Sequence, residues 1–175
     1  MIQIKDKEFV PYINQEALQQ RITELGNAIS EDCRTQCPIL IGVLNGSYMF
    51  LGDLSKSISI PIEICFLKIA SYTGTSSTGT VNQLMGLDAD IADRHVIIVE
   101  DIVDTGLSMS FLLEKIKSLG PKSVRIATLL TKPEALKHPI NLDYVGFEIP
   151  NKFVVGYGLD YDGLGRNLPA IFQLK

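Results

Sequence analysis

Short apolar runs typical of buried strands alternate along this chain with segments whose apolar residues recur at helical spacing. The helical segments are expected to begin at Asn14, after the turn at 45–47, and at Leu107, and the last should bury Leu112, Leu113, Ile116 and Leu119. Strands that alternate with helices predict an α/β fold with a central, mainly parallel sheet flanked by helices. The expected strands are PILIGVL, IEICFLKIAS, TVNQLMG, HVIIVED, SVRIATLLT, DYVGFEI and FVVGYGL.

Length and composition narrow the classes of protein. The 175 residues, 46% of them hydrophobic, suit a single domain with a substantial core. The net charge of −4 disfavours a nucleic-acid partner, and the chain lacks the apolar run of about 18–20 residues needed to span a membrane. Three cysteines suit a reducing cytosol, and the pair Cys33 and Cys37 lacks the neighbouring ligands of a zinc site. We therefore expect a cytoplasmic protein without nucleic-acid or membrane partners.

Three acids follow the most apolar strand, in the stretch VIIVEDIVDTGLS. Ligands of parallel sheets bind at the carboxyl ends of strands, which places Asn45–Gly46, Asp101–Ser108 and Lys132 at one rim. Unpaired carboxylates repel one another and are costly to bury. Glu100, Asp101 and Asp104 therefore predict a metal ion or a polyhydroxylated, metal-bound ligand.

The turn after these acids has the parts of a phosphate cradle. Thr105 and Ser108 offer hydroxyl groups, Gly106 lets the backbone come close, and a helix N-terminus follows. An ordinary helix N-cap turn would explain the same letters. The adjacent Glu100 and Asp101 could reach a ribose diol, which together with the cradle favours a ribose 5-phosphate.

The stretch VIIVEDIVDTGLS resembles the phosphoribosyl-diphosphate signature of type I phosphoribosyltransferases, and VGFEIPNKFVVGYGLDY resembles their hypoxanthine-guanine branch. VLNGSYMF, SYTGTSSTG and TLLTK follow in the family's order, so the resemblance covers Ile39–Pro169. It implies a type I phosphoribosyltransferase fold in one domain, 1–175. The core would span about 14–140, and a small hood would combine about 150–175 with the N-terminal segment. A mobile lid would cover about 71–79, with Ser71 and Tyr72 as its matching residues.

The resemblance implies transfer of a ribose 5-phosphate from phosphoribosyl diphosphate to a purine N9, with Mg²⁺ as cofactor. Diphosphate leaves from an oxocarbenium-like sugar, so the metal would neutralise the departing charge. By the same resemblance Asp104 handles the purine N7 proton, and Asp160 binds one metal. Glu100 and Asp101 would hold the ribose hydroxyls and a second metal. The phosphate would be held by a loop of four residues, Thr105, Gly106, Leu107 and Ser108.

The remaining matches concern the base and the diphosphate. Lys132 would donate to the purine 6-oxo group, Phe153 would stack on the ring, and Val154 and Asp160 would complete the base site. Asn45, Gly46 and Arg166 would bind diphosphate, although many relatives carry a basic residue at the position of Asn45. Without the resemblance, Lys132 and Arg166 would be surface residues and Phe153 a core residue. Leu107 stands where a lysine can occur, which leaves phosphate contact to amides and hydroxyls.

Hypoxanthine and guanine are therefore the expected substrates, IMP and GMP the products, and adenine a poor substrate. The family also implies a homodimer or homotetramer. Two alternative hypotheses for the function stay open. A phosphoribosyl-diphosphate-sensing regulator would keep the binding loop without turnover, and a xanthine-guanine or pyrimidine-related transferase would differ in its base.

Overall fold

The computed structural model describes the backbone of residues 1–73 and 80–175 and the side chains of residues 1–69 and 86–175. Its larger sheet has the strand order β5-β4-β3-β6-β7-β8. All neighbouring strands pair in parallel except β5, which runs antiparallel to β4. This confirms the predicted α/β class with a mainly parallel sheet. The strands are β3 (Ile39–Leu44), β4 (Glu63–Thr73), β5 (Thr80–Met85), β6 (His95–Val103), β7 (Ser123–Thr131) and β8 (Tyr144–Glu148).

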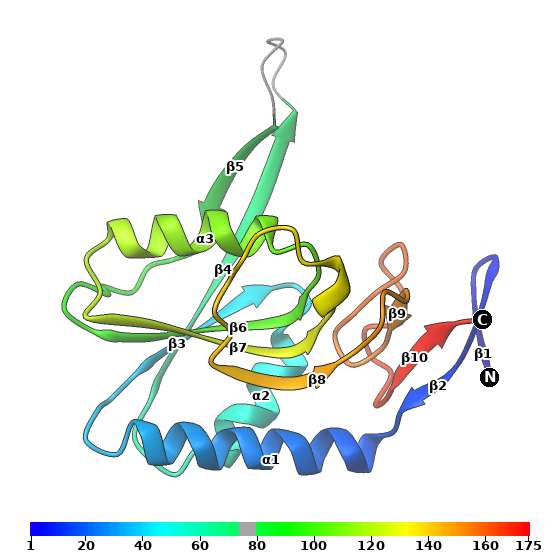
Figure 1. The fold of residues 1–175 in the computed structure, drawn as a ribbon, viewed down its shortest axis with the longest axis horizontal. Coiled ribbons are helices and arrows are strands. Elements are labelled where there is room, and N and C mark those ends of the chain that lie inside the picture. The colour runs from blue at the N-terminus through cyan, green and yellow to red at the C-terminus, as the bar shows by residue number, and fades with distance from the viewer. Residues whose placement is uncertain (74–79) are drawn as a thin grey trace.

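Helices cover both faces of this sheet (Figure 1). α1 (Gln15–Asp32) and α2 (Tyr48–Ser57) pack on one face, and α3 (Leu107–Ser118) lies on the other. A single 3₁₀ turn, η1 (Pro133–Ala135), follows β7. The two faces of the sheet therefore carry separate apolar clusters, as expected for strands that are apolar along their whole length.

The first helix begins where its sequence predicts. The side chain of Asn14 accepts a hydrogen bond from the amide of Ala17 at 2.8 Å, which satisfies one free donor of the first turn. The predicted inward residues of α1 are all buried: Leu18, Ile22, Leu25 and Ile29. The prediction for α3 is wrong at one position, since Leu119 is 48% exposed. The helix ends at Ser118, so Leu119 is its C-cap residue and does not belong to the inward face of the helix.

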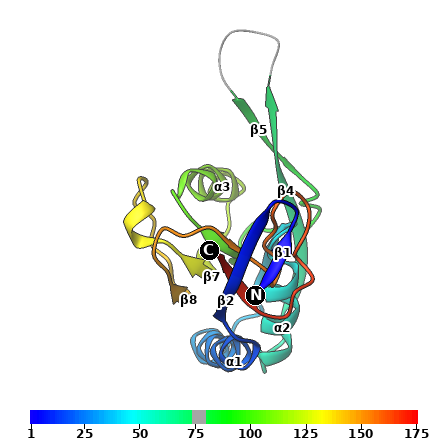
Figure 2. The same ribbon diagram turned by 90° about the vertical axis from the view of Figure 1, so that its right-hand side faces the viewer.

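A second, antiparallel sheet joins both ends of the chain in the order β1-β2-β10-β9. Its strands are β1 (Ile2–Ile4), β2 (Lys7–Ile13), β9 (Val154–Val155) and β10 (Ile171–Leu174). Figure 2 looks onto this small sheet, which we call the hood, with both termini in view. Ile4, Phe9 and Val155 form its buried centre. The predicted strand FVVGYGL is cut short after Val155, because Gly156, Tyr157 and Gly158 all have positive φ angles.

No helix in the described part of the chain is both long and apolar enough to cross a membrane.

Candidate active site

The loops after β3, β6 and β7 meet at one edge of the sheet, because these strands are parallel and adjacent. The loop after β3 contains Asn45 and Gly46, and the peptide bond between Leu44 and Asn45 is cis. A Cβ atom added to Gly46 would collide with the carboxylate of Asp101. Glycine at this position therefore lets the loop after β3 lie directly against the acids of β6.

The predicted phosphate loop lines a cavity of about 250 Å³. Gly106 has a φ of 81°, and an added Cβ would lie 2.9 Å from the carbonyl oxygen of His138. The carbonyl of Thr105 accepts hydrogen bonds from the amides of Lys137 and His138, at 3.0 and 3.2 Å. These hydrogen bonds hold the phosphate loop against the segment that contains Lys137 and His138. The lining comprises Val43, Ile69, Glu100, Ile102, Val103, Asp104, Thr105, Gly106, Leu107, Ser108 and Met109.

A second cavity, also of about 250 Å³, lies between the sheet edge and the hood. The two cavities share Ile102 and Asp104, so Asp104 stands where they meet. The residues predicted to hold the purine all line this one cavity, although they come from three separate parts of the chain. Its lining is Asp101, Ile102, Asp104, Lys132, Phe153, Val154, Leu159 and Asp160.

Lys132 and Asp104 form an ion pair inside this cavity. The Lys132 ammonium lies 2.8 Å from the Asp104 carboxylate, and the Lys132 amide donates to the carbonyl of Val103 at 3.1 Å. Lys132 is only 6% exposed, so the alternative of a surface lysine is wrong. Pairing and backbone anchoring together hold a buried donor beside a half-exposed acceptor.

Phe153 presents its ring to solvent and to the second cavity. It is 44% exposed, which rules out a plain core residue, and its ring packs edge-on against Tyr161 with 5.9 Å between centroids. Phe9 supports it from β2 at 6.3 Å. An aromatic ring held in place by two others offers a flat surface on which a planar base can stack.

The two adjacent acids of β6 are destabilised as anions. Burial raises the pKa of Glu100 well above its usual range, and the neighbouring Asp101 carboxylate adds to this. Burial also raises the pKa of Asp101, against the lowering effect of hydrogen bonds and of the Arg166 charge. The Asp101 carboxylate accepts a hydrogen bond from the Ile102 amide at 2.9 Å. This pair is therefore suited to a ligand that brings positive charge or hydroxyl donors.

Arg166 reaches back toward the sheet edge from the segment before β10. Its guanidinium lies 2.6 Å from the carboxylate of Asp160 and donates to the carbonyl of Gly158, also at 2.6 Å. The other oxygen of Asp160 accepts from the amide of Gly163 at 2.7 Å. Asp160 and Arg166 are thus held as a pair at the hood side of the second cavity.

Whether a divalent metal fits these residues can be judged from the donor set. Among residues 1–73 and 80–175, no three His, Cys, Asp or Glu side chains gather closely enough to hold a metal by themselves. Asp101 and Asp160 nevertheless both line the second cavity, with oxygen donors of the kind Mg²⁺ prefers. Mg²⁺ commonly takes one or two carboxylates and completes its shell with phosphate and water oxygens. The residues fit a metal that arrives together with a diphosphate.

The predicted lid lies outside the described residues for the most part. Ser71 and Tyr72 belong to the end of β4, and 74–79 are not described. Sequence reasoning missed Leu159, which lines the second cavity, and Gly158, which lies against Gly46. Both belong to the loop between β9 and β10, which we call the hood loop. The closely spaced glycines of VGYGLD were the available signal, because such spacing is typical of a tight, irregular turn.

Comparisons with known proteins give the chain its family. Residues 12–162 match the model of the phosphoribosyl transferase domain. The hypoxanthine-guanine phosphoribosyltransferase of Mycobacterium tuberculosis is 46% identical over 166 residues, which is 91% of this chain and 82% of the relative. The corresponding protein of Bacillus subtilis is 43% identical over 164 residues, covering 93% and 91%.

Solved structures agree with this match. The hypoxanthine phosphoribosyltransferase of Trypanosoma cruzi, in complex with the product IMP, superposes with a TM-score of 0.87 at 34% identity, covering 100% and 98% of the two chains. A hypoxanthine-guanine phosphoribosyltransferase of Bacillus anthracis gives 0.86 at 36%, covering 97% and 98%. The chain therefore belongs to the phosphoribosyltransferase family and, within it, to the hypoxanthine-guanine phosphoribosyltransferases.

Proposed function

We propose that this protein transfers the 5-phosphoribosyl group from phosphoribosyl diphosphate to N9 of hypoxanthine and guanine, giving IMP or GMP and diphosphate. The observation that carries the proposal is the Asp104–Lys132 pair at the junction of the two cavities. One cavity has the loop and helix N-terminus that suit a sugar phosphate, and the other has the aromatic surface that suits a base.

The pair matches one edge of a 6-oxopurine. That edge carries an oxygen acceptor at C6 and, in the tautomer that reacts at N9, an N–H donor at N7. Lys132 can donate to the oxygen while Asp104 accepts from the N–H, so the base would replace an existing ion pair with two charge-assisted hydrogen bonds. Adenine presents an amino group at C6 and would leave the buried Lys132 without an acceptor. A buried donor left unpaired can lower the reactivity of an analogue by about 10⁴–10⁵-fold.

The reaction also assigns a task to Asp104. As the bond between the sugar C1 and the diphosphate oxygen breaks, N9 forms a bond to C1 and the purine gains positive charge. Asp104 takes the N7 proton, which restores a neutral base in the nucleotide. A carboxylate positioned for this transfer contributes about 10²–10⁴-fold to the rate.

The other acids and Arg166 would serve the sugar and the leaving group. Glu100 and Asp101 would accept hydrogen bonds from the ribose hydroxyls, and the loop from Thr105 to Ser108 would hold the 5-phosphate. Gly46 and Arg166 would bind diphosphate, with Asn45 as a further neighbour. Bound Mg²⁺, held in part by Asp101 and Asp160, would supply charge neutralisation at the departing diphosphate. Ser71 and Tyr72 would belong to a lid that keeps water away.

The assay that tests the proposal incubates the protein with phosphoribosyl diphosphate, Mg²⁺ and either hypoxanthine or guanine, and follows nucleotide and diphosphate together. Equal amounts of the two products are expected with each base. Tight, Mg²⁺-dependent binding of phosphoribosyl diphosphate without nucleotide formation would contradict the proposal and favour the regulator. We further propose that the protein acts in the cytosol, where its three free cysteines stay reduced, and as a homodimer or homotetramer.

A further inference from the structure

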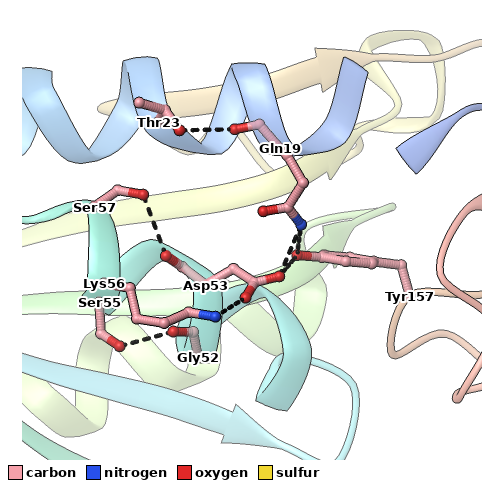
Figure 3. A network of polar contacts seen from close by, with 8 residues as sticks. All are labelled: Gln19, Thr23, Gly52, Asp53, Ser55, Lys56, Ser57 and Tyr157. Atoms are coloured by element: carbon pink, nitrogen blue, oxygen red, sulfur yellow. Dashed lines mark hydrogen bonds and ion pairs between the residues drawn. The ribbon is translucent and has the colours of Figure 1, made fainter. Parts of the chain in front are cut away.

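One partly buried polar network ties the hood to both helices on one face of the sheet (Figure 3). The hydroxyl of Tyr157, from the hood loop, donates to the carboxylate of Asp53 on α2. Gln19 on α1 donates to the same carboxylate at 2.8 Å and to the Tyr157 hydroxyl at 3.2 Å. Lys56 lies 2.6 Å from the other oxygen of Asp53. Asp53 thus has partners from three separate elements.

Tyr157 is held in an unusual backbone conformation. Its φ is 51°, which is rare for a residue with a large side chain, and its ring is almost completely buried. Its amide donates to the carbonyl of Leu168 at 2.9 Å, and its neighbours Gly156 and Gly158 have φ angles of 100° and 102°. Such conformations persist only where the surroundings determine them, and they cluster near functional sites. The contacts of the hydroxyl are part of that determination.

Gly158, the residue after Tyr157, contacts residues that are assigned to diphosphate binding. A Cβ added to Gly158 would collide with the carbonyl oxygen of Gly46, so the hood loop lies directly on the loop after β3. The carbonyl of Gly158 accepts from the Arg166 guanidinium, and its amide donates to the Arg166 carbonyl at 2.9 Å. Gly158 therefore contacts Gly46 and Arg166, two of the residues assigned to diphosphate, and Tyr157 directly precedes it in the chain.

We propose that the Tyr157–Asp53 hydrogen bond is a positioning contact for phosphoribosyl diphosphate. It fixes the hood loop against α2, whose N-terminal end follows the Gly46 loop, and so sets Arg166 and Asp160 relative to Gly46. Neither Tyr157 nor Asp53 lines the two cavities, so each acts through the residues that do. The inference rests on the proposed function for the identity of the ligand.

Tyr157→Phe is the central variant, and Tyr144→Phe is its matched control. Tyr144 also donates its hydroxyl to an aspartate, Asp32 at 2.9 Å, but it lies at the start of β8, away from the carboxyl edge of the sheet. Each change removes one buried hydroxyl bonded to a carboxylate, so both should lower the melting temperature by similar amounts. Only Tyr157→Phe should also weaken binding of phosphoribosyl diphosphate.

The readouts are the Kd of phosphoribosyl diphosphate with Mg²⁺, the kinetic constants and the melting temperature, each measured on folded protein. Tyr157→Phe should raise that Kd about 10-fold, as expected for loss of a hydrogen bond to a charged group, and Tyr144→Phe should leave it within about twofold. Asp53→Leu removes the acceptor from the α2 side and should also raise the Kd. The effects of Asp53→Leu and Tyr157→Phe should not add, because the two residues share one contact.

A Tyr157→Phe protein with a lowered melting temperature and an unchanged Kd would overturn the proposal, because the contact would then serve stability alone. If Tyr157→Phe does not fold, an unchanged Kd in Asp53→Leu would overturn it equally. The Kd is measured without any purine. The positioning role therefore stands or fails separately from catalysis, which the product assay on the unchanged protein decides.

Discussion

At Asp104, replacing one carboxylate oxygen with an amide nitrogen separates a role in proton transfer from a role in binding. It lines both cavities, and its only ion-pair partner among the described residues is Lys132. At this position a carboxylate can accept the proton whereas an amide cannot, although either could contact the substrate. Substituting asparagine therefore tests its role with little change of shape.

Asp104→Asn should lower kcat by about 10²–10⁴-fold, since the N7 proton loses its acceptor. The Kd of phosphoribosyl diphosphate should stay within about twofold of the unchanged protein. Steady-state kinetics and equilibrium binding check the two values on the same preparation. A large rise in this Kd with little loss of kcat would mean that Asp104 holds phosphoribosyl diphosphate and does not accept the proton.

Glu100 carries a cost in stability that follows from its raised pKa. In the unfolded chain the carboxyl loses its proton near its ordinary value of 4.5, whereas in the folded protein it keeps the proton to a higher pH. The folded state thus binds more protons between these values, and the free energy of unfolding falls as pH rises through them. Neutral Glu100 suits the fold, and anionic Glu100 opposes it.

Glu100→Gln should therefore raise the melting temperature at neutral pH, by about 2–4 °C for each kcal/mol of relief. The gain should disappear at pH 4, where both states of the unchanged protein are protonated. Thermal unfolding at several pH values checks this, and binding of phosphoribosyl diphosphate should weaken in the same variant. A melting temperature that is lower than that of the unchanged protein at neutral pH would contradict the prediction.

At the scale of elements, the loop after β3 depends on close backbone approach. Gly46 leaves space that the carboxylate of Asp101 occupies, whereas Gly52, in α2, has open space around its missing side chain. The two glycines are six residues apart and differ in just this respect. They form a matched pair for testing whether the loop must lie against β6.

Gly46→Ala should lower the free energy of unfolding by about 1–3 kcal/mol through overpacking, and it should weaken binding of phosphoribosyl diphosphate at least about 10-fold. Gly52→Ala should stabilise the helix by about 0.5–1 kcal/mol and leave that binding unchanged. Chemical denaturation and ligand titration measure both effects. Equal behaviour of the two variants would show that the close approach at Gly46 is not needed.

The sequence predicts the elements of the larger sheet well because their signals are local. Asn14 caps the helix whose inward residues it precedes, and HVIIVED is apolar enough to belong only at the centre of a sheet. The hood strands β1, β2 and β10 are not predicted, and β2 shows why: it combines charged residues with Pro11 and pairs with β10 from the far end of the chain. Pairing between segments so far apart in the sequence leaves no periodic pattern of residues from which it could be predicted.

The same distinction holds for the site. The sequence places Asp101–Ser108 at a strand end, and the family resemblance brings in Lys132, Phe153 and Asp160, which the structure then gathers around one cavity. It could not predict that Asp104 pairs with Lys132, or that Tyr157 reaches Asp53 across 104 positions. Such contacts depend on tertiary packing, which spacing along the chain does not encode.

At the scale of the whole molecule, two sheets with separate buried centres share one site. The larger sheet supplies the phosphate loop and the acids, and the hood supplies Phe153, Asp160 and Arg166. A ligand that spans both parts should hold them together, so its binding should stabilise the folded protein as a whole.

Phosphoribosyl diphosphate with Mg²⁺, at about 100 times its Kd, should add about 2.7 kcal/mol to the free energy of unfolding. Chelation of the metal with EDTA should remove most of this gain, since the diphosphate would lose its neutralising ion. Melting temperatures with ligand, metal and chelator in all combinations check the prediction. An equal gain with and without the metal would contradict a metal-dependent site.

The most direct test of the central claim is a competition among bases for one site. The protein is incubated with phosphoribosyl diphosphate, Mg²⁺ and equal concentrations of hypoxanthine, guanine and adenine, and the nucleotides formed are separated and quantified. The Asp104–Lys132 pair predicts IMP and GMP in abundance with almost no AMP. AMP formed at a rate comparable to IMP would contradict the claim that this pair reads the 6-oxo edge of the base.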